Sequence, residues 1–319
     1  METITGRILI TGALGQIGTE LSAKLSDIYG KDNVVATDIR DAHDNNPAGH
    51  YEVLDVMDFE KAKNIIEKYN IRTVYHLASL LSGTAELKPE LAWKLNIDPL
   101  LFFCNQAKDK IIDRIFWPSS IAVFGREIPK TNVGQEVPLN PSTVYGITKL
   151  AGEKWCEYYF NKYGVDIRSV RYPGLISWKA PAGGGTTDYA VEIYYKAIEE
   201  GKYTSFISEN TAMPMMYMDD AIDATLQLMH APKESITVHS SYNLGGMSFT
   251  PKELSESIKK EMPNFQISYE PDFRQAIADS WPASIDDCVA AKDWGLKYTF
   301  DIDSMTKEML QNLKVKLSK

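Results

Sequence analysis

Short apolar runs alternate with longer amphipathic stretches over the first half of the chain. The run at Arg7–Thr11 predicts a buried strand, and apolar side chains then recur at helical spacing. Further strands are expected at 33–38, 51–54, 73–77, 114–118 and 165–171, and further helices at Phe59–Tyr69, at 91–108 and from about 143. This alternation predicts βαβ units and a mostly parallel sheet.

The pattern changes after Tyr172. Proline and glycine interrupt it at Pro173, Pro181 and 183–185, and an apolar stretch at 215–230 leads back to the sheet. The predicted fold is therefore α/β, with a Rossmann-type doubly wound parallel sheet and a smaller, discontinuous C-terminal substrate lobe. We expect the sheet domain to comprise 1–174 and 215–243, and the second lobe to comprise 175–214 and 244–319.

Composition narrows the range of partners. The formal net charge of -9 leaves no basic field to neutralise phosphates, so neither nucleic acid nor an anionic membrane is an expected partner. No apolar run is long enough to span a bilayer, and the chain begins without an apolar signal region, which predicts a cytoplasmic protein. The 3 cysteines and 5 histidines are scattered without ligand spacing, so no metal site is expected.

A glycine-rich loop joins the first strand to the first helix. Gly12, Gly15 and Gly18 form a G-x-x-G-x-x-G pattern, in which glycine lets the backbone approach a pyrophosphate at the helix N-terminus. A plain turn is the alternative, but strand, loop and helix fall where a dinucleotide-binding motif requires them. The cofactor contacts predicted from this loop are Gly12, Leu14, Gly15, Gln16, Ile17 and Gly18.

Acidic residues end the next two strands. A carboxylate at Asp38 can accept hydrogen bonds from both ribose hydroxyls and would repel a 2′-phosphate, so NAD is favoured over NADP. Arg40 could soften this preference, or it could be an ordinary solvated arginine. Asp55 could accept from the adenine amino group or cap the helix that starts near Asp58, and both interpretations stay open. The sheet domain is thus predicted to bind NAD.

Tyr145 and Lys149 lie four residues apart at the start of a predicted helix, which puts both side chains on one face. A free tyrosine titrates near ~10, but a neighbouring ammonium and a cationic nicotinamide favour the phenolate. Tyr145 could then remove a proton from a substrate hydroxyl as hydride leaves the carbon. An exposed helical pair without a chemical role is the alternative.

Two serines precede this helix at the end of a strand. The hydroxyl of Ser119 or Ser120 can form a hydrogen bond with the reacting oxygen and orient it. Successive strand residues point in opposite directions, so one of the two serines is expected to face the substrate. The choice between them stays open.

These features together resemble the extended short-chain dehydrogenase/reductase family over essentially the whole chain. The resemblance rests on the residues above and on 76–79, Asn96 and 171–173. It implies that Asp55 holds the adenine and that 172–173 pass near the nicotinamide. The further cofactor contacts expected are Ile39, Arg40, Asp55, Val56, Leu77, Ala78, Ser79, Asn96, Tyr145, Lys149, Tyr172, Pro173 and Ile176.

Most members of this family act on nucleotide-sugars. They typically carry an asparagine shortly after the Arg-Tyr pair and an arginine in a later R-x-Y-x-x-V-D-D segment, and both contact the diphosphate. This sequence has Gly174 at the first place and methionines, including Met215 and Met216, where the cation would be needed. A buried diphosphate would then be uncompensated, which is costly. A nucleotide-sugar substrate is therefore disfavoured.

The distinctive segments at 117–125, 171–177, 183–190 and 213–220 resemble the L-threonine 3-dehydrogenases of the same family. This resemblance implies oxidation of the β-hydroxyl of L-threonine by NAD to 2-amino-3-oxobutyrate, and a homodimer formed through helices near 91–108 and 143–163. The expected substrate contacts are Ser82, Ser119, Tyr145, Gly185, Thr186, Thr187 and Trp281. A core position is the alternative for Trp281, and a nucleotide-sugar enzyme or a non-catalytic NAD sensor are the alternatives for the whole chain.

Overall fold

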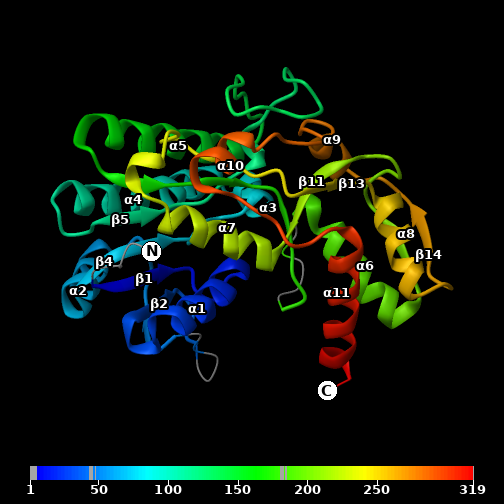
Figure 1. The fold of residues 1–319 in the computed structure, drawn as a ribbon, viewed down its shortest axis with the longest axis horizontal. Coiled ribbons are helices and arrows are strands. Elements are labelled where there is room, and N and C mark those ends of the chain that lie inside the picture. The colour runs from blue at the N-terminus through cyan, green and yellow to red at the C-terminus, as the bar shows by residue number, and fades with distance from the viewer. Residues whose placement is uncertain (1–5, 43–45, 47, 180–182, 184, 319) are drawn as a thin grey trace.

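A parallel sheet of 6 strands forms the centre of the larger domain in the computed structural model, in the order β3-β2-β1-β4-β5-β7. Figure 1 labels four of these strands, β1, β2, β4 and β5. The structure describes residues 6–42, 46, 48–179, 183 and 185–318. The strands are β1 (Arg7–Thr11), β2 (Val34–Asp38), β3 (His50–Val53), β4 (Ile71–His76), β5 (Arg114–Phe116) and β7 (Asp166–Arg168). The predicted Rossmann-type fold is confirmed.

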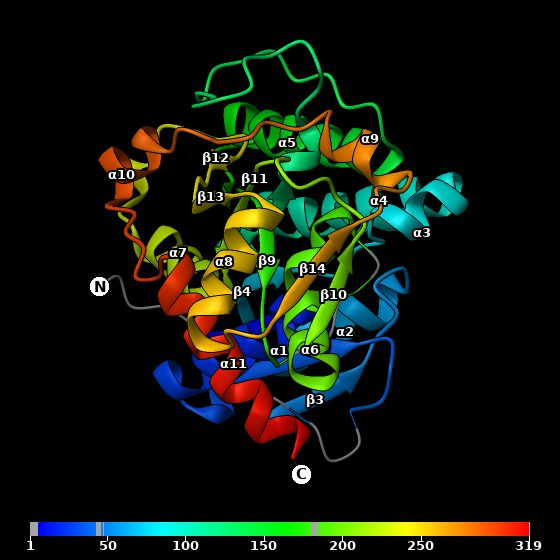
Figure 2. The same cartoon turned by 90° about the vertical axis from the view of Figure 1, so that its right-hand side faces the viewer.

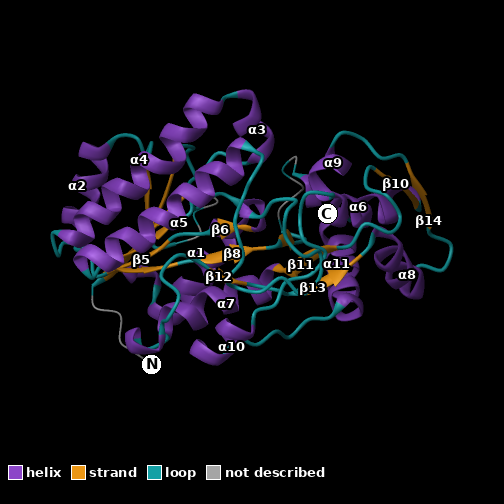
Figure 3. Cartoon of the chain, turned by 90° about the horizontal axis from the view of Figure 1, so that it is seen from above, coloured by secondary structure: helices purple, strands orange, loops and turns teal. Residues whose placement is uncertain are grey.

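Helices cover both faces of this sheet, as Figure 3 shows. One face carries α1 (Gln16–Tyr29), α7 (Met218–His230) and α10 (Cys288–Trp294), and the other carries α2 (Phe59–Tyr69), α4 (Pro89–Lys108) and α5 (Val144–Tyr163). Strand alternation divides the core between them: Ile8 and Ile10 belong to the first cluster, and Leu9 to the second. Because both faces are buried there, the interior positions of the central strands β1 and β2 are apolar, at 8–10 and 34–36.

Short strands extend the carboxyl edge of the sheet. The first group is β6 (Ser119–Ser120), β8 (Val170–Tyr172) and β12 (Tyr242–Asn243), and the second is β9 (Gly174–Ile176), β11 (Met213–Tyr217) and β13 (Met247–Phe249). Since β6 and β8 follow β5 and β7 directly in the chain, they carry the backbone beyond the main sheet to the edge where ligands of doubly wound sheets bind.

A second lobe packs beyond this edge (Figure 2). Its larger elements are α6 (Tyr189–Glu200), β10 (Lys202–Ser205), α8 (Pro251–Glu261), β14 (Gln266–Tyr269) and α11 (Ile302–Leu317). Two short helices elsewhere in the chain are α3 (Ser82–Leu87) and α9 (Arg274–Ala278). The apolar cluster that fills this lobe extends to residues 121–133 beside the sheet. Strands β9 and β11 pair with each other, and each crosses a predicted domain boundary, at 174/175 and at 214/215. The predicted division of the chain into two domains therefore stays a prediction. Among the described residues, no helix could cross a membrane.

Candidate active site

The glycine loop leads directly from β1 into α1. Gly12 adopts φ +70, and a Cβ there would lie 2.8 Å from the backbone nitrogen of Ala78. A Cβ at Gly18 would overlap the carbonyl oxygen of Gly12. Gly15 stands at the N-cap of α1 and provides no side-chain cap, so the first-turn N–H groups of α1, which starts at Gln16, can bind an anion. The loop fits a dinucleotide pyrophosphate.

Asp38 is held in place at the end of β2. Its carboxylate accepts hydrogen bonds from the backbone N–H of Leu14 (3.0 Å) and from Nε of Arg40 (2.9 Å). Burial raises the pKa of this carboxyl, but the hydrogen bonds from Arg40 and Leu14 outweigh burial and lower the pKa below its usual value. Asp38 is therefore ionised at neutral pH. Arg40 is largely exposed but pairs with Asp38, and Ile39 between them is exposed.

The loops after β3 and β4 lie beside the glycine loop. Asp58 caps α2 by accepting from the N–H of Lys61 (3.0 Å), so Asp55 is not the cap of that helix. Asp55 accepts instead from the N–H of Met57 (3.0 Å), and Val56 is buried beside it. After β4, the backbone N–H groups of Leu77 and Ala78 donate to the backbone oxygen and side-chain oxygen of Thr11.

Asn96 connects the loop after β4 to α5. Its Oδ1 accepts from the hydroxyl of Ser79 (3.0 Å) and the N–H of Leu80 (2.8 Å). Its Nδ2 donates to the oxygen of Leu80 (3.2 Å) and to the hydroxyl of Thr148 (3.0 Å). The amide thus uses its hydrogen-bonding capacity on the protein, and it fixes the loop that borders the predicted cofactor.

Tyr145 lies in the first turn of α5. Thr143 caps this helix by accepting from the N–H of Gly146 (3.1 Å), which sets where the turn begins. One turn later, the buried Nζ of Lys149 donates to the carbonyl oxygen of Pro118 (2.7 Å) and lies 5.4 Å from the centre of the Tyr145 ring. The structure therefore brings the two predicted catalytic side chains together.

Burial shifts both groups toward their neutral forms. It raises the pKa of Tyr145 to about 12, although a hydrogen bond with Ser120 acts in the opposite direction. It lowers the pKa of Lys149 to about 7. A tyrosine base at this position consequently needs a further positive charge beside it, and an oxidised nicotinamide ring carries one.

The two serines of β6 point to different partners. Ser120 is half-buried, its Oγ accepts from the N–H of Ala122 (3.2 Å), and its hydroxyl lies near enough to Tyr145 to act on the pKa of that phenol. The hydroxyl of Ser119 is buried and donates to Oε1 of Glu153 (2.6 Å). The strand alternation expected from the sequence thus separates them, with Ser120 on the side of Tyr145.

A buried ion pair that the sequence does not predict lies behind the serines. The two carboxylate oxygens of Glu153 accept from Nε (2.9 Å) and Nη2 (2.8 Å) of Arg171, and Nη1 of Arg171 donates to Asn243 (2.9 Å). This pair ties α5 to β8 and β12. Sequence spacing would pair Glu153 with Lys149, four residues earlier on the same helix, so it gives no signal for the pair with Arg171.

The segment after β8 crosses from the sheet into the second lobe. The ring of Tyr172 packs in the core with α7, and its hydroxyl forms a hydrogen bond with Thr225, so the side chain faces away from Tyr145. Pro173 is buried, and Ile176 lies in the core of the second lobe.

The predicted substrate contacts come from three further segments. Gly185 starts a short 3-10 turn in which Thr186 is buried, and a Cβ on Gly174 would lie 2.7 Å from Cγ2 of Thr187. Trp281 is 9% exposed and belongs to the apolar cluster against which Tyr145 packs. Ser82 begins α3, whose Glu86 accepts from the N–H of Val144 at the start of α5 (2.7 Å). Gly184 lies outside the described residues.

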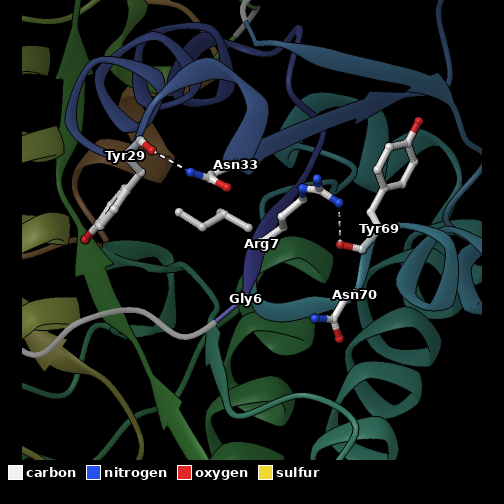
Figure 4. A pocket seen from close by; sticks show the side chains of 7 residues that line it. Gly6, Arg7, Tyr29, Asn33, Tyr69 and Asn70 are labelled. Atoms are coloured by element: carbon white, nitrogen blue, oxygen red, sulfur yellow. Dashed lines mark hydrogen bonds between the residues drawn. The ribbon is translucent and has the colours of Figure 1, made fainter.

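A separate cavity of about 460 Å³ lies at the amino ends of β1 and β4 (Figure 4). The residues that line it are Gly6, Arg7, Ile8, Tyr29, Asn33, Tyr69 and Asn70. The Arg7 guanidinium is occupied by the backbone oxygens of Asp32 and Tyr69. Since cofactors of doubly wound sheets bind at the carboxyl ends of the strands, this cavity is not the candidate active site. No cluster of metal-ligating side chains occurs among the described residues.

We expect Glu153→Ala to lower the free energy of unfolding by about 3–5 kcal/mol, because it leaves the Arg171 charge buried without its partner. Equilibrium unfolding in urea measures this loss. Glu157→Ala, one turn further along α5 in an exposed pair with Lys154, is the matched control and should cost about 0–1 kcal/mol. Equal losses in the two variants would contradict a structural role for the buried pair.

Comparison with known proteins agrees with this geometry. A model of the NAD dependent epimerase/dehydratase family matches residues 8–245. An uncharacterized epimerase/dehydratase of Staphylococcus haemolyticus is 50% identical over 313 residues, which cover 97% of this chain and 98% of that protein.

Two solved structures are similar to the whole chain. An L-threonine dehydrogenase from Clostridium difficile is 48% identical with a TM-score of 0.95, and the match covers 98% of this chain and 99% of that one. A monomeric L-threonine 3-dehydrogenase from a metagenome database, in its apo form, is 50% identical with a TM-score of 0.93, and the match covers 98% and 100%. The chain therefore belongs to the NAD-dependent epimerase/dehydratase family, as the glycine loop and the Tyr145–Lys149 pair predict.

Proposed function

We propose that this protein is an NAD-dependent L-threonine 3-dehydrogenase, which oxidises the β-hydroxyl of L-threonine to 2-amino-3-oxobutyrate. The observation that carries the proposal is that Gly174, Met215 and Met216 are all buried, at places where nucleotide-sugar enzymes of the family need polar and cationic groups. Met215 belongs to the apolar cluster against which Tyr145 packs. Such apolar surroundings would leave a diphosphate uncompensated and suit a small substrate without one. The similarity to L-threonine dehydrogenases at 48–50% identity supports the same substrate.

The catalytic roles follow from the side chains around Tyr145. The Ser120 hydroxyl orients the β-hydroxyl of threonine, and the Tyr145 phenolate accepts the proton of that hydroxyl. Lys149 supplies positive charge that favours the phenolate. NAD, when bound, provides the hydride acceptor, so the removal of one hydride and one proton converts the alcohol to the ketone.

The ends of the zwitterionic substrate need polar partners. We assign this task to Thr186 and Ser82, with Gly185 and Thr187 ordering the loop and Trp281 closing the apolar side. Thr186 has only 4% of its surface exposed, so its hydroxyl is a sheltered rather than a solvated partner for a charged group.

NAD is held by the glycine loop and by Asp38, whose ionised carboxylate opposes a 2′-phosphate. We expect Asp38→Asn to lower the ratio of kcat/KM with NAD to kcat/KM with NADP by about tenfold or more, the equivalent of ~1.4 kcal/mol. Asp41→Asn, an exposed carboxylate three residues away, is the control. An unchanged cofactor ratio in Asp38→Asn would exclude the carboxylate as the selective group.

Tyr145→Phe tests the chemical step. Without the phenolic oxygen, kcat for L-threonine should fall by roughly 10²–10⁴-fold, while the affinity for NAD stays within about twofold. NADH absorbance measures turnover, and protein fluorescence measures NAD binding. Tyr158→Phe, an exposed tyrosine on the same helix, should retain wild-type activity. Retained turnover in Tyr145→Phe would reject this tyrosine as the base. If the wild-type protein turns over a UDP-sugar but not L-threonine, the assignment of L-threonine as the substrate is wrong.

We infer a homodimer formed through α4 and α5. These helices expose large apolar side chains that include Leu91 and Trp93 on α4 and Ile147 and Trp155 on α5. Sedimentation equilibrium at micromolar concentration should give twice the mass of one chain. A single-chain mass, as for the similar protein described as monomeric, would contradict the dimer.

A further inference from the structure

Trp117 lies beneath the ammonium group of Lys149. It directly follows β5, and its backbone N–H donates to the oxygen of Arg168 (3.0 Å), which fixes the backbone beside β7. The side chain is 2% exposed. Nζ of Lys149 lies 4.6 Å from the centre of the Trp117 ring, well within the distance at which a cation is attracted to an indole face.

Gly152 lets the indole reach this position. A Cβ on Gly152 would lie within 2.5 Å of Cζ2 of Trp117, so the ring packs directly against the backbone of α5. Glycine inside a helix costs about 1 kcal/mol relative to alanine. The structure gives the reason for tolerating that cost: any side chain at 152 would displace the ring from Lys149.

Few other groups stabilise the charge on Lys149. The Pro118 carbonyl, on the segment between β5 and β6, is its hydrogen-bond acceptor. On its own helix, the Glu153 carboxylate favours the charged form but is already paired with Arg171, and Tyr145 presents a neutral ring at neutral pH. Burial raises the pKa of the Cys156 thiol, which therefore stays neutral.

On the strand side of Lys149, His76 at the end of β4 is buried against Thr11. Its pKa falls to about 3, first through burial and then through the Lys149 charge, so it carries no charge at neutral pH. Within the described ranges, no carboxylate forms an ion pair with Lys149. Burial lowers the pKa of Lys149 to about 7, so modest stabilisation decides whether it is charged under working conditions.

We propose that Trp117 is a positioning residue for catalysis, whose indole face keeps Lys149 protonated and directed toward Tyr145. The inference rests on the proposed function for the role of Lys149, but the contact between indole and ammonium can be tested without turnover. In this role Trp117 acts on Tyr145 through Lys149.

Removing the Trp117 indole should lower the pKa of Lys149. The Lys149 ammonium is then less stable, and its pKa falls by roughly half to one and a half units. Tyr145 then loses its positive neighbour at neutral pH, and its pKa rises. The acidic limb of the pH profile of kcat/KM for L-threonine therefore moves to higher pH.

Two substitutions separate the ring's charge effect from its volume. Trp117→Leu removes the aromatic face, and Trp117→Phe keeps a weaker one, so the limb should move further in Trp117→Leu than in Trp117→Phe. Gly152→Ala, which displaces the ring from the opposite side, should move the limb in the same direction. If all three variants lose kcat equally at every pH and the limb stays in place, the indole is only a packing group and the proposal is overturned.

A fluorescence titration tests the contact in the free protein. The emission of wild type minus that of Trp117→Phe isolates Trp117, and it should change over roughly pH 6 to 9 as Lys149 loses its proton. The change should be absent in Lys149→Met, which retains Trp117. A transition that persists in Lys149→Met, or none in wild type, overturns the proposal. A Lys149-dependent transition in a protein that does not oxidise L-threonine supports the contact and rejects the proposed function instead.

Discussion

The buried ion pair between Glu153 and Arg171 is the interaction on which the candidate active site depends. Two charges removed from water are stable only when their geometry is good and their remaining lone pairs are satisfied. Here both carboxylate oxygens meet the guanidinium, Ser119 donates to the same carboxylate, and Asn243 accepts from the guanidinium. The pair therefore fixes the position of α5 relative to β6, β8 and β12.

This constraint arranges the residues around Tyr145. Lys149 precedes Glu153 by about one helical turn, and Tyr145 precedes Glu153 by about two. Because Glu153 is held in place, the positions of Lys149 and Tyr145 relative to the strand ends are set as well. Because Glu153 engages Ser119, the alternation of β6 leaves Ser120 beside Tyr145. One interaction far from solvent thus determines which serine meets the reacting oxygen in the proposed mechanism.

The sequence predicts the alternating strands and helices of the first half of the chain well, because hydrophobic periodicity and glycine spacing are set by residues close together in the sequence. Residues Arg7–Thr11 and Phe59–Tyr69 form the expected strand and helix. The expected strand at 114–118 instead ends at Phe116, since Pro118 has no N–H to continue the ladder. Strand β10 pairs with β14 over more than sixty residues of chain, and no local signal specifies that pairing.

The candidate site likewise has residues that the sequence predicts and residues that it does not. Tyr145 and Lys149 are recognisable because their spacing places them on one helix face. Asn96 is predicted beside the cofactor, yet its role in holding 79–80 depends on partners from two other segments. Glu153 and Trp117 escape sequence reasoning for a related reason: their partners, Arg171 and Lys149, become neighbours only when α5 packs on the strand ends.

A crystal structure of the protein with NAD and L-threonine bound tests most directly which serine assists Tyr145. We predict that the β-hydroxyl of threonine lies within hydrogen-bond distance, about 2.5–3.0 Å, of both the Tyr145 and the Ser120 hydroxyls. Ser119 should remain on Glu153. A threonine hydroxyl bound to Ser119, with Ser120 turned away and the Glu153–Arg171 pair broken, would contradict this prediction.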